Sequence, residues 1–287
     1  MPIAPLSELG KRPLVMGIIN ATPDSFSGDG VMRNGDHIKA ALALAAKMVA
    51  DGADMLDIGG ESSRPGSTPI EAAEEIRRTR PVIESIRAKF PDLPIAIDTV
   101  KPAVAEAALA AGVCLINDIS ALKDVEMVKL AVASGAYVVL MHNRADPAAA
   151  TQDPQTGGEY HAPTYNDVVA DVGLELGARI EAVCEAGVMP DHIIADPGLG
   201  FGKTVAQNCA LLNRLDKLKA RLGCPIMVGP SRKSFIGRVL DLPVEQRLEG
   251  TAAAVAIAIV RGADIVRVHD VKEMARVARM AAAIRSS

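Results

Sequence analysis

Aromatic side chains are scarce in this sequence. They make up 2% of the 287 residues, and tryptophan is absent. A protein that binds bases or sugars by stacking would have few rings available for it. The net charge of −4 arises from 31 basic and 35 acidic residues, and no basic stripe stands out among them. Both observations disfavour a nucleic-acid partner.

Paired cysteines and long apolar runs are also missing. The four cysteines show no CxxC pair and no metal-ligand spacing, which is typical of small buried apolar side chains in a reducing compartment. Residues 1–13 contain no apolar core of a signal peptide, and the longest apolar run, residues 252–260, is too short to span a bilayer. We therefore expect a cytoplasmic protein without a membrane partner.

Several cofactor motifs are absent as well. No GxGxxG follows the first apolar run, and no HxH or HExxH occurs anywhere. Residues 200–204 read GFGKT, but a phosphate-binding GxxxxGK[ST] loop would need glycine where Pro197 stands. The sequence thus disfavours a P-loop nucleotidase, a dinucleotide-binding Rossmann domain and a zinc hydrolase.

What the chain does contain is a regular alternation of strand and helix patterns. Eight short β-branched runs occur at residues 14–19, 54–58, 94–97, 113–116, 136–141, 192–195, 225–228 and 264–268. Eight helical patterns follow them, at residues 36–50, 69–89, 102–111, 124–134, 165–186, 205–221, 244–261 and 271–284. Nearly continuous apolar strands alternating with helices predict a parallel sheet covered on its faces. We expect an α/β fold, a (β/α)8 TIM barrel in one domain over residues 1–287, with an open doubly wound sheet as the alternative.

One segment departs from this alternation. Residues 143–163 are polar and rich in proline, glycine and alanine. They form a long predicted βα loop, and we expect either a lid or a disordered segment there.

Polar side chains follow almost every predicted strand. The first run ends in Asn20, within MGIINATPDSFSGDG, and later runs lead into Asp98, Asn117, Asp196 and the RVHD segment at 267–270. In a (β/α)8 barrel these positions meet at one mouth, where active sites lie. Each acidic or amide side chain could instead cap the next helix, an alternative that the sequence leaves open.

The chemistry of these side chains falls into two groups. Carboxylate, amide and ammonium groups suit the edge of a flat heterocycle, because a buried carboxylate can accept two parallel N–H donors; they are Asp98, Asn117, Asp196 and Lys233. Cations with an amide suit a phosphate group; they are Asn20, Arg64, Arg267 and His269. Three of the four phenylalanines fall in predicted loops, which indicates stacking on a flat ligand; they are Phe26, Phe201 and Phe235.

These stretches together resemble the dihydropteroate synthase family, folate-pathway enzymes that sulfonamides inhibit. The resemblance rests on one motif per predicted βα loop over nearly the whole chain: MGIINATPDSFS, DIGGESSRPGS, IDT, IND, LMH, DPGLGFGKT, GPSRKSFIG and RVHDV. It implies a TIM barrel, usually a homodimer, that joins 6-hydroxymethyl-7,8-dihydropterin diphosphate to 4-aminobenzoate and releases diphosphate and 7,8-dihydropteroate. It also implies Mg²⁺ as cofactor and an SN1-like path without a general base.

The resemblance assigns roles to individual residues. The implied pterin-binding residues are Asp98, Asn117, Asp196, Lys233, Met141, Ile119, Phe201 and Gly229. The implied diphosphate-binding residues are Asn20, which is also the implied Mg²⁺ ligand, Arg64, Arg267 and His269. The implied aminobenzoate-binding residues are Phe26, Ser63, Arg64, Pro65, Lys233 and Ser234.

Small departures from the family pattern occur at four places: Ala21 where valine is common, SGDG at 27–30 in place of SDGG, Ser63 in place of threonine, and the segment after His142, which lacks the usual methionine and is longer than is typical. Three other functions compete with the synthase. They are a methyltetrahydrofolate-dependent methyltransferase with a corrinoid partner, a catalytically silent pterin-binding protein, and an aldolase that forms a Schiff base on Lys233. The SRKS and RVH segments favour the synthase, because both fit diphosphate binding.

Overall fold

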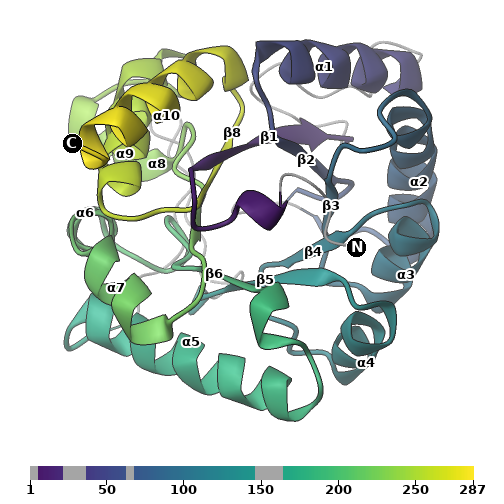
Figure 1. Cartoon of the computed structure of the whole chain (residues 1–287), viewed down its shortest axis with the longest axis horizontal. Helices are drawn as coiled ribbons and strands as arrows, with labels where there is room; N and C mark the ends of the chain where they lie inside the picture. The colour runs from purple at the N-terminus through teal and green to yellow at the C-terminus, as the bar shows by residue number, and fades with distance from the viewer. Residues whose placement is uncertain (1–5, 22–36, 63–67, 146–163) are drawn as a thin grey trace.

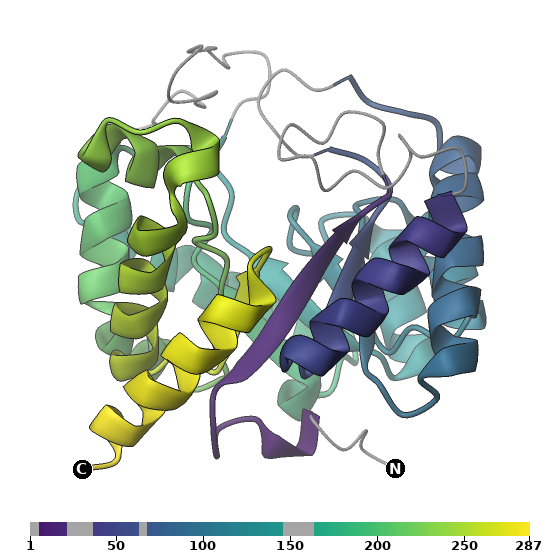
Figure 2. The same cartoon turned by 90° about the horizontal axis from the view of Figure 1, so that it is seen from above.

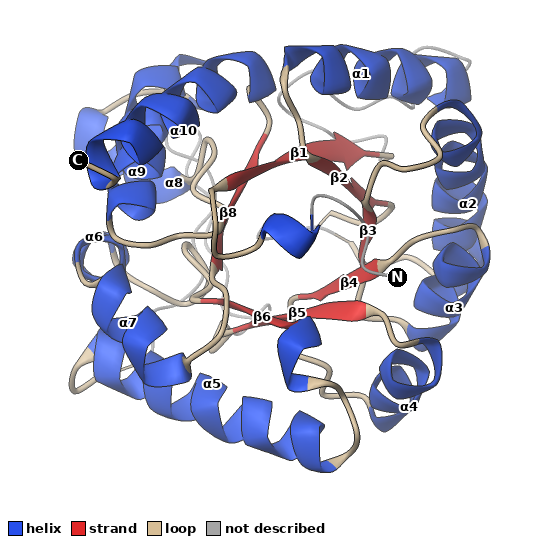
Figure 3. Ribbon diagram, in the orientation of Figure 1, coloured by secondary structure: helices blue, strands red, loops and turns tan. Residues whose placement is uncertain are grey.

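The described chain forms an eight-stranded parallel sheet. Its strands surround a central axis, with helices outside them (Figures 1 and 3). The structure, a computed structural model, describes residues 6–21, 37–62, 68–145 and 164–287. The strands are β1 (Leu14–Asn20), β2 (Met55–Gly59), β3 (Ile95–Asp98), β4 (Leu115–Asp118), β5 (Tyr137–Met141), β6 (Ile193–Asp196), β7 (Met227–Val228) and β8 (Ile265–Val268).

Ten α-helices lie outside the strands in the described part of the chain: α1 (His37–Asp51), α2 (Ala72–Lys89), α3 (Pro102–Ala110), α4 (Val125–Ser134), α5 (Val168–Glu185), α6 (Val205–Asn213), α7 (Leu215–Leu222), α8 (Ser234–Leu240), α9 (Leu248–Val260) and α10 (Val271–Arg285). Three short 3₁₀ turns add η1 (Leu6–Glu8), η4 (Pro190–His192) and η5 (Val244–Gln246). None of these helices combines the length and hydropathy needed to cross a membrane.

The sheet closes on itself. Its hydrogen-bonded order is β6-β5-β4-β3-β2-β1-β8-β7, and a parallel bridge between Ala195 and Ile226 joins the two ends. The Ala195 amide also donates to the carbonyl of Pro225 at 2.9 Å. The predicted TIM barrel is therefore confirmed, and the open doubly wound sheet is wrong.

The barrel has two apolar layers, set by the alternation of side chains along each strand. One residue in two points inward, and a small inner cluster forms from side chains such as Met16, Met55, Ala96 and Ile194. Leu6 of η1 covers this cluster at the amino-terminal end, as the short central helix in Figure 3 shows. The other residues of each strand pack outward against the helices in the large cluster. Polar side chains that continue the inward series must therefore lie at the opposite, carboxyl end.

Two helix predictions were wrong in detail. The pattern at residues 205–221 is not one helix, because Arg214 leaves the helical conformation with φ −116° and ψ 26° and separates α6 from α7. Helix α8 was not expected, and it begins directly after Lys233. Figure 2 shows β1 rising from the end where η1 lies toward the opposite end of the barrel.

Candidate active site

The inward series of β1, β3, β4, β6 and β8 ends in a polar side chain at the carboxyl end of the barrel. Register places Asp98 opposite Asn117, and Met141 opposite Asp196. Asn117 and Asp196 are buried, at 3% and 6% exposure. Because these positions continue the inward side of the barrel, the cap alternative is wrong for Asn117, whose amide binds another strand's side chain.

Arg267 on β8 is the centre of an ionic network. Its Nε donates to Oδ2 of Asp57 at 2.5 Å, and its Nη2 donates to Oδ2 of Asp98 at 2.7 Å. Asn117 Nδ2 donates to the same Asp57 oxygen at 2.9 Å. One guanidinium thus connects strands β2, β3 and β8, and Asp57 orients both Arg267 and the Asn117 amide.

Two carboxylates share this single cation. Burial raises the pKa of Asp98 to about 7, and the charges of Asp57, Glu75 and Asp118 add to the effect, while Arg267 opposes it. The Asp98 side chain is still 16% exposed, so it faces the mouth, whereas Asp57 is fully buried. Among the described residues, none donates a hydrogen bond to Oδ1 of Asp57. Of the two carboxylates, the partly exposed Asp98 is therefore the one that can accept N–H groups from a ligand at the mouth.

Asp196 and Lys233 are two further buried groups of opposite charge at the mouth, and the charge of each acts on the other. Burial raises the pKa of Asp196, against the opposing charge of Lys233. Burial lowers the pKa of Lys233 to about 8, although Asp196 raises it. Oδ1 of Asp196 accepts the Gly198 N–H at 2.7 Å, while Lys233 Nζ donates to the Leu199 carbonyl and lies 4.6 Å from the Phe201 ring centre.

A strained turn presents Lys233. Arg232, the preceding residue, has φ +56°, which is uncommon for a residue with a side chain. Its guanidinium binds Asp270 through bonds of 3.0 and 2.6 Å, and its carbonyl accepts from Arg247 at 3.0 Å. Strain held by surrounding contacts is typical of functional sites. The same turn brings Ser231 Oγ within 3.0 Å of His269 Nδ1.

The remaining predicted residues are placed as follows. Met141 is buried at the end of β5, and Ile119 lines a cavity of about 50 Å³ together with Asp98. Gly229 lies beside Arg267: a Cβ added to Gly229 would be 3.7 Å from the Cβ of Arg267. Ser234 begins α8, and Asn20 ends β1 half-buried. Four predicted residues lie outside the described residues: Phe26, Ser63, Arg64 and Pro65. Most of the predicted loop at 143–163 lies outside them too.

Two expectations need correction. Phe235 does not face a ligand; it lies in α8 at 5% exposure, within the outer apolar cluster. Asp118, next to Asn117, points away from the mouth and accepts the Ser120 and Leu122 amides at 2.6 and 3.0 Å. Asp118 therefore satisfies the turn after β4; it neither faces the mouth nor caps the next helix, because Asp124 is the N-cap of α4.

Asp57 lies within the second predicted strand, residues 54–58, but received no role in the sequence interpretation. The signal was available, because Asp57 follows Met55 by two residues and must share its inward direction. A carboxylate on the buried face of a strand needs a partner, and only the fold could identify Arg267, 210 residues away.

The described part of the chain contains no ready-made cluster of metal-binding side chains. No group of three or more histidine, cysteine, aspartate or glutamate side chains there could hold an ion. The amide oxygen of Asn20 is a hard donor that suits Mg²⁺. An ion at this rim would therefore need oxygen atoms from a substrate or water.

The sequence model of the family described as "Pterin binding enzyme" matches residues 16–269. The dihydropteroate synthase of Synechocystis is 44% identical over 281 residues, which cover 97% of this chain and 92% of that protein. The chain belongs to the dihydropteroate synthase family. A Yersinia pestis dihydropteroate synthase solved with a sulfonamide drug complex superposes with a TM-score of 0.88 at 39% identity, covering 97% of this chain and 96% of the other.

Xanthomonas albilineans dihydropteroate synthase is similar in two ligand complexes. The structure with 4-aminobenzoic acid gives a TM-score of 0.85 at 40% identity, and the structure with 7,8-dihydropteroate gives 0.80 at 38%. Each covers 97% of this chain and 95% of the other. Membership of the dihydropteroate synthase family makes the protein a transferase, and the motifs at the mouth are the ones on which the resemblance rested.

Proposed function

We propose that this protein joins 6-hydroxymethyl-7,8-dihydropterin diphosphate to 4-aminobenzoate, forming 7,8-dihydropteroate and diphosphate. The observation that carries the proposal is the convergence of two charged groups at one barrel mouth: Asp196 with Lys233, and Asp98 with Asn117 and Arg267. A flat ligand with N–H donors along its edge fits between them. The Xanthomonas relative holds 4-aminobenzoic acid or 7,8-dihydropteroate in a barrel of the same shape.

The pterin end of the substrate satisfies the buried carboxylates. A ring N–H beside an exocyclic amino group presents two parallel donors, which match the two oxygens of Asp196. Lys233 then donates to a ring acceptor while its ammonium lies over the Phe201 ring. Asn117 gives its Nδ2 to Asp57 and so turns its amide oxygen toward the ligand. Met141, Ile119 and Gly229 complete this pocket in the proposal.

The diphosphate end would be bound by Arg267, His269 and Asn20, and by Arg64 as the family resemblance implies. Arginine is charged at every physiological pH and suits phosphate oxygens. Asn20 would hold Mg²⁺ together with diphosphate oxygens and water. When bound, this ion would neutralise the negative charge that develops on the departing diphosphate.

The chemistry follows a dissociative path. The bond between the methylene carbon and the diphosphate oxygen breaks first, and its electron pair leaves with the diphosphate. The electron-rich pterin stabilises the resulting cation, and Arg267 and His269 stabilise the departing anion. The amine of 4-aminobenzoate attacks the carbon and then loses a proton to water. Phe26, Ser63, Pro65 and Ser234, with Lys233 and Arg64, frame the aminobenzoate, so we expect sulfonamides to compete there.

The test is incubation of the protein with the pterin diphosphate, 4-aminobenzoate and Mg²⁺, with both products measured. We expect diphosphate and dihydropteroate in equal amounts. Diphosphate release without dihydropteroate, or no turnover, would contradict the proposal. Methyl transfer from methyltetrahydrofolate would instead support the corrinoid-dependent alternative.

We also propose a homodimer in the cytoplasm. Of the eleven exposed large apolar side chains in the described residues, six lie on α8, α9 and α10: Val239, Leu240, Ile257, Val260, Met280 and Ile284. Helices α9 and α10 lie side by side (Figure 1), which makes an apolar face for a second copy. All four cysteines are unpaired, which fits a reducing compartment. Sedimentation of Met280→Glu tests the dimer: it should be monomeric, and an unchanged mass would refute this interface.

A further inference from the structure

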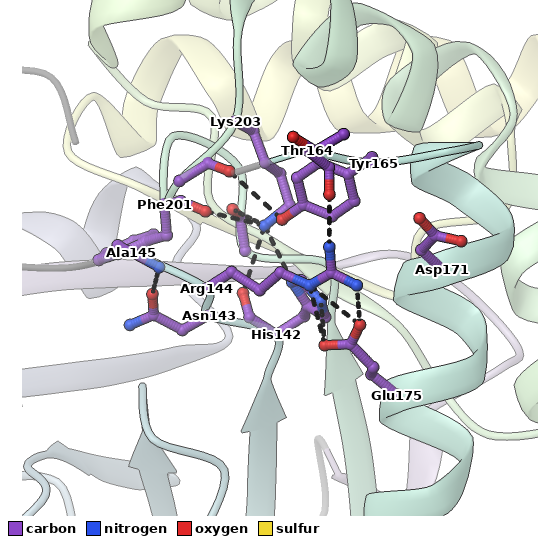
Figure 4. Close-up of polar contacts among 12 residues, drawn as sticks. His142, Asn143, Arg144, Ala145, Thr164, Tyr165, Asp171, Glu175, Phe201 and Lys203 are labelled. Carbon is purple, nitrogen blue, oxygen red and sulfur yellow. Dashed lines mark hydrogen bonds and ion pairs between the residues drawn. The ribbon is translucent and has the colours of Figure 1, made fainter. Parts of the chain in front are cut away.

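A buried lysine outside the proposed substrate contacts lies behind the loop between β6 and α6, residues 197–204. Lys203 is 3% exposed. Its Nζ lies 3.0 Å from Nδ1 of His142, and it donates to the carbonyls of Gly198 and Phe201 at 3.0 Å each. A longer bond of 3.4 Å reaches the His142 carbonyl. Figure 4 shows these contacts meeting at the single ammonium group.

His142 is arranged as an acceptor for Lys203 Nζ, whose own pKa burial lowers to about 7. Burial and the neighbouring Lys203 charge lower the pKa of His142 to about 3, although Glu175 opposes the shift, so the imidazole is neutral at physiological pH. Its Nε2 then carries the proton and donates to Glu175 Oε2 at 3.1 Å, which leaves Nδ1 free to accept from Lys203. Arg144 neutralises Glu175 and stacks on Tyr165, 4.3 Å from its ring centre.

The loop lies very close to the end of β5. Gly198 has φ +67°, and a Cβ there would overlap the His142 carbonyl oxygen. Gly202 has φ +59°, and a Cβ there would lie 2.9 Å from the Ala145 amide nitrogen. Asn208 holds the other side of the loop through a 2.7 Å bond from the Gly200 N–H to its Oδ1. The loop is thus fixed from both sides, with Lys203 as the inner attachment.

This loop contacts two charged residues of the proposed pterin pocket, Asp196 and Lys233. The Gly198 N–H donates to Asp196, the Leu199 carbonyl accepts from Lys233, and the Phe201 ring lies beside the Lys233 ammonium. Two of these three residues also have their carbonyls bound by Lys203, namely Gly198 and Phe201. A shift of the loop would therefore move Asp196 and Lys233 relative to each other.

We infer that Lys203 is a positioning residue of the pterin pocket: by binding His142 and the carbonyls of Gly198 and Phe201, it sets the loop that holds Asp196 and Lys233. The inference rests on the proposed function of that pocket. Lys203 itself contacts no substrate in this account. The competing interpretation is that Lys203 only stabilises the fold.

The test compares Lys203→Met with the wild-type protein. Methionine has a similar length but cannot donate, so it leaves four acceptors without their partner. We expect the Kd for 6-hydroxymethyl-7,8-dihydropterin, measured by calorimetry on folded protein, to rise by about 10-fold or more. The further gain in affinity from the diphosphate group should change less than about 2-fold, because Arg267 and His269 lie on another strand and its loop.

A matched control is Lys129→Met, because Lys129 is exposed on α4 and pairs only with Glu126 in the described contacts. It should leave both Kd values unchanged. A purely structural role predicts a lower melting temperature for Lys203→Met with an unchanged pterin Kd, and that result would overturn the inference. Failure of the wild-type protein to bind the pterin would instead overturn the proposed function.

Lys203→Arg decides the case if Lys203→Met does not fold. Arginine keeps the charge and the donors, but its wider head cannot sit 3.0 Å from the same three acceptors. We expect a folded protein with a pterin Kd raised about 3-fold or more. A pterin Kd equal to that of the wild type in Lys203→Arg would overturn the inference.

Discussion

The ionic network at the barrel mouth makes Asp57 the sharpest target for substitution. Its Oδ2 accepts from both Arg267 Nε and Asn117 Nδ2, while its Oδ1 has no hydrogen-bond partner in the part of the chain that the structure describes. In Asp57→Asn the amide oxygen can take the place of Oδ2 and the NH2 group the place of Oδ1. The variant therefore keeps both hydrogen bonds and removes only the charge.

The magnitude follows from the burial of Asp57. A charge-assisted hydrogen bond is about twice as strong as a neutral one, so the two bonds should lose about 1–2 kcal/mol together. The buried NH2 adds about 1 kcal/mol if it finds no acceptor. We expect Asp57→Asn to lower the free energy of unfolding by about 2–3 kcal/mol, and Asp57→Ala by about 3–5 kcal/mol because the buried Arg267 then loses one of its two partners.

Urea unfolding at pH 7.5 measures these values, and calorimetry measures pterin binding by the folded variants. Lys47→Ala, which removes an exposed pair with Asp51 on α1, is a control expected to cost less than about 1 kcal/mol. Equal stability and pterin affinity in the wild type and Asp57→Asn would refute the role given to the Asp57 charge.

Four further predictions concern the ligands. Asp196→Asn should weaken pterin binding about 10- to 100-fold, because it removes a charged acceptor and keeps the shape. Arg267→Lys should weaken binding of the pterin diphosphate more than that of the bare pterin, because lysine cannot bind Asp57, Asp98 and a phosphate together. Burial lowers the pKa of Lys233 from 10.5 to about 8, so its ammonium, and with it pterin affinity, should be lost as the pH rises through 8. Chelation of Mg²⁺ should reduce turnover and leave binding of the bare pterin unchanged.

Calorimetry with both pterins, repeated across pH, checks the first three predictions, and a turnover assay with EDTA checks the fourth. The charges of Asp196, Arg267 and Asp98 also act on Lys233. Lys233→Arg is the control, because arginine stays charged above pH 8 and should remove the loss of pterin affinity there. Each prediction has one result that would contradict it. For Asp196→Asn it is an unchanged pterin affinity, and for Arg267→Lys it is an equal loss of affinity for both pterins. For Lys233 it is a wild-type pterin affinity that does not change with pH, and for Mg²⁺ it is full turnover in EDTA.

Much of the architecture could be predicted from the sequence, because the repeated apolar runs and intervening helices reflect local periodicity. The break at Arg214 and the short helix α8 could not, since nothing local in the pattern distinguishes them from their surroundings. Phe235 was misassigned for the same reason: a helix too short to show periodicity hid its buried face.

The site was predictable in its residue types and only partly in its contacts. Position at a strand end was enough to select Asp98, Asn117 and Asp196. The bond from Arg267 to Asp57 depends on β8 lying two strands from β2, which follows from barrel closure and not from any local signal. Lys203 belongs to the GFGKT segment that was rejected as a P-loop. Its contact with His142 could be identified only from the fold, because the two residues lie on different strand–helix units.

The most direct test of the account is a structure of the protein with 6-hydroxymethyl-7,8-dihydropterin diphosphate bound. The account predicts the fused ring in the barrel mouth, with hydrogen bonds to Asp196, Asn117 and Lys233, and the diphosphate directed toward Arg267 and His269. A ring bound elsewhere, or bound in the mouth without contact to Asp196 and Lys233, would contradict it.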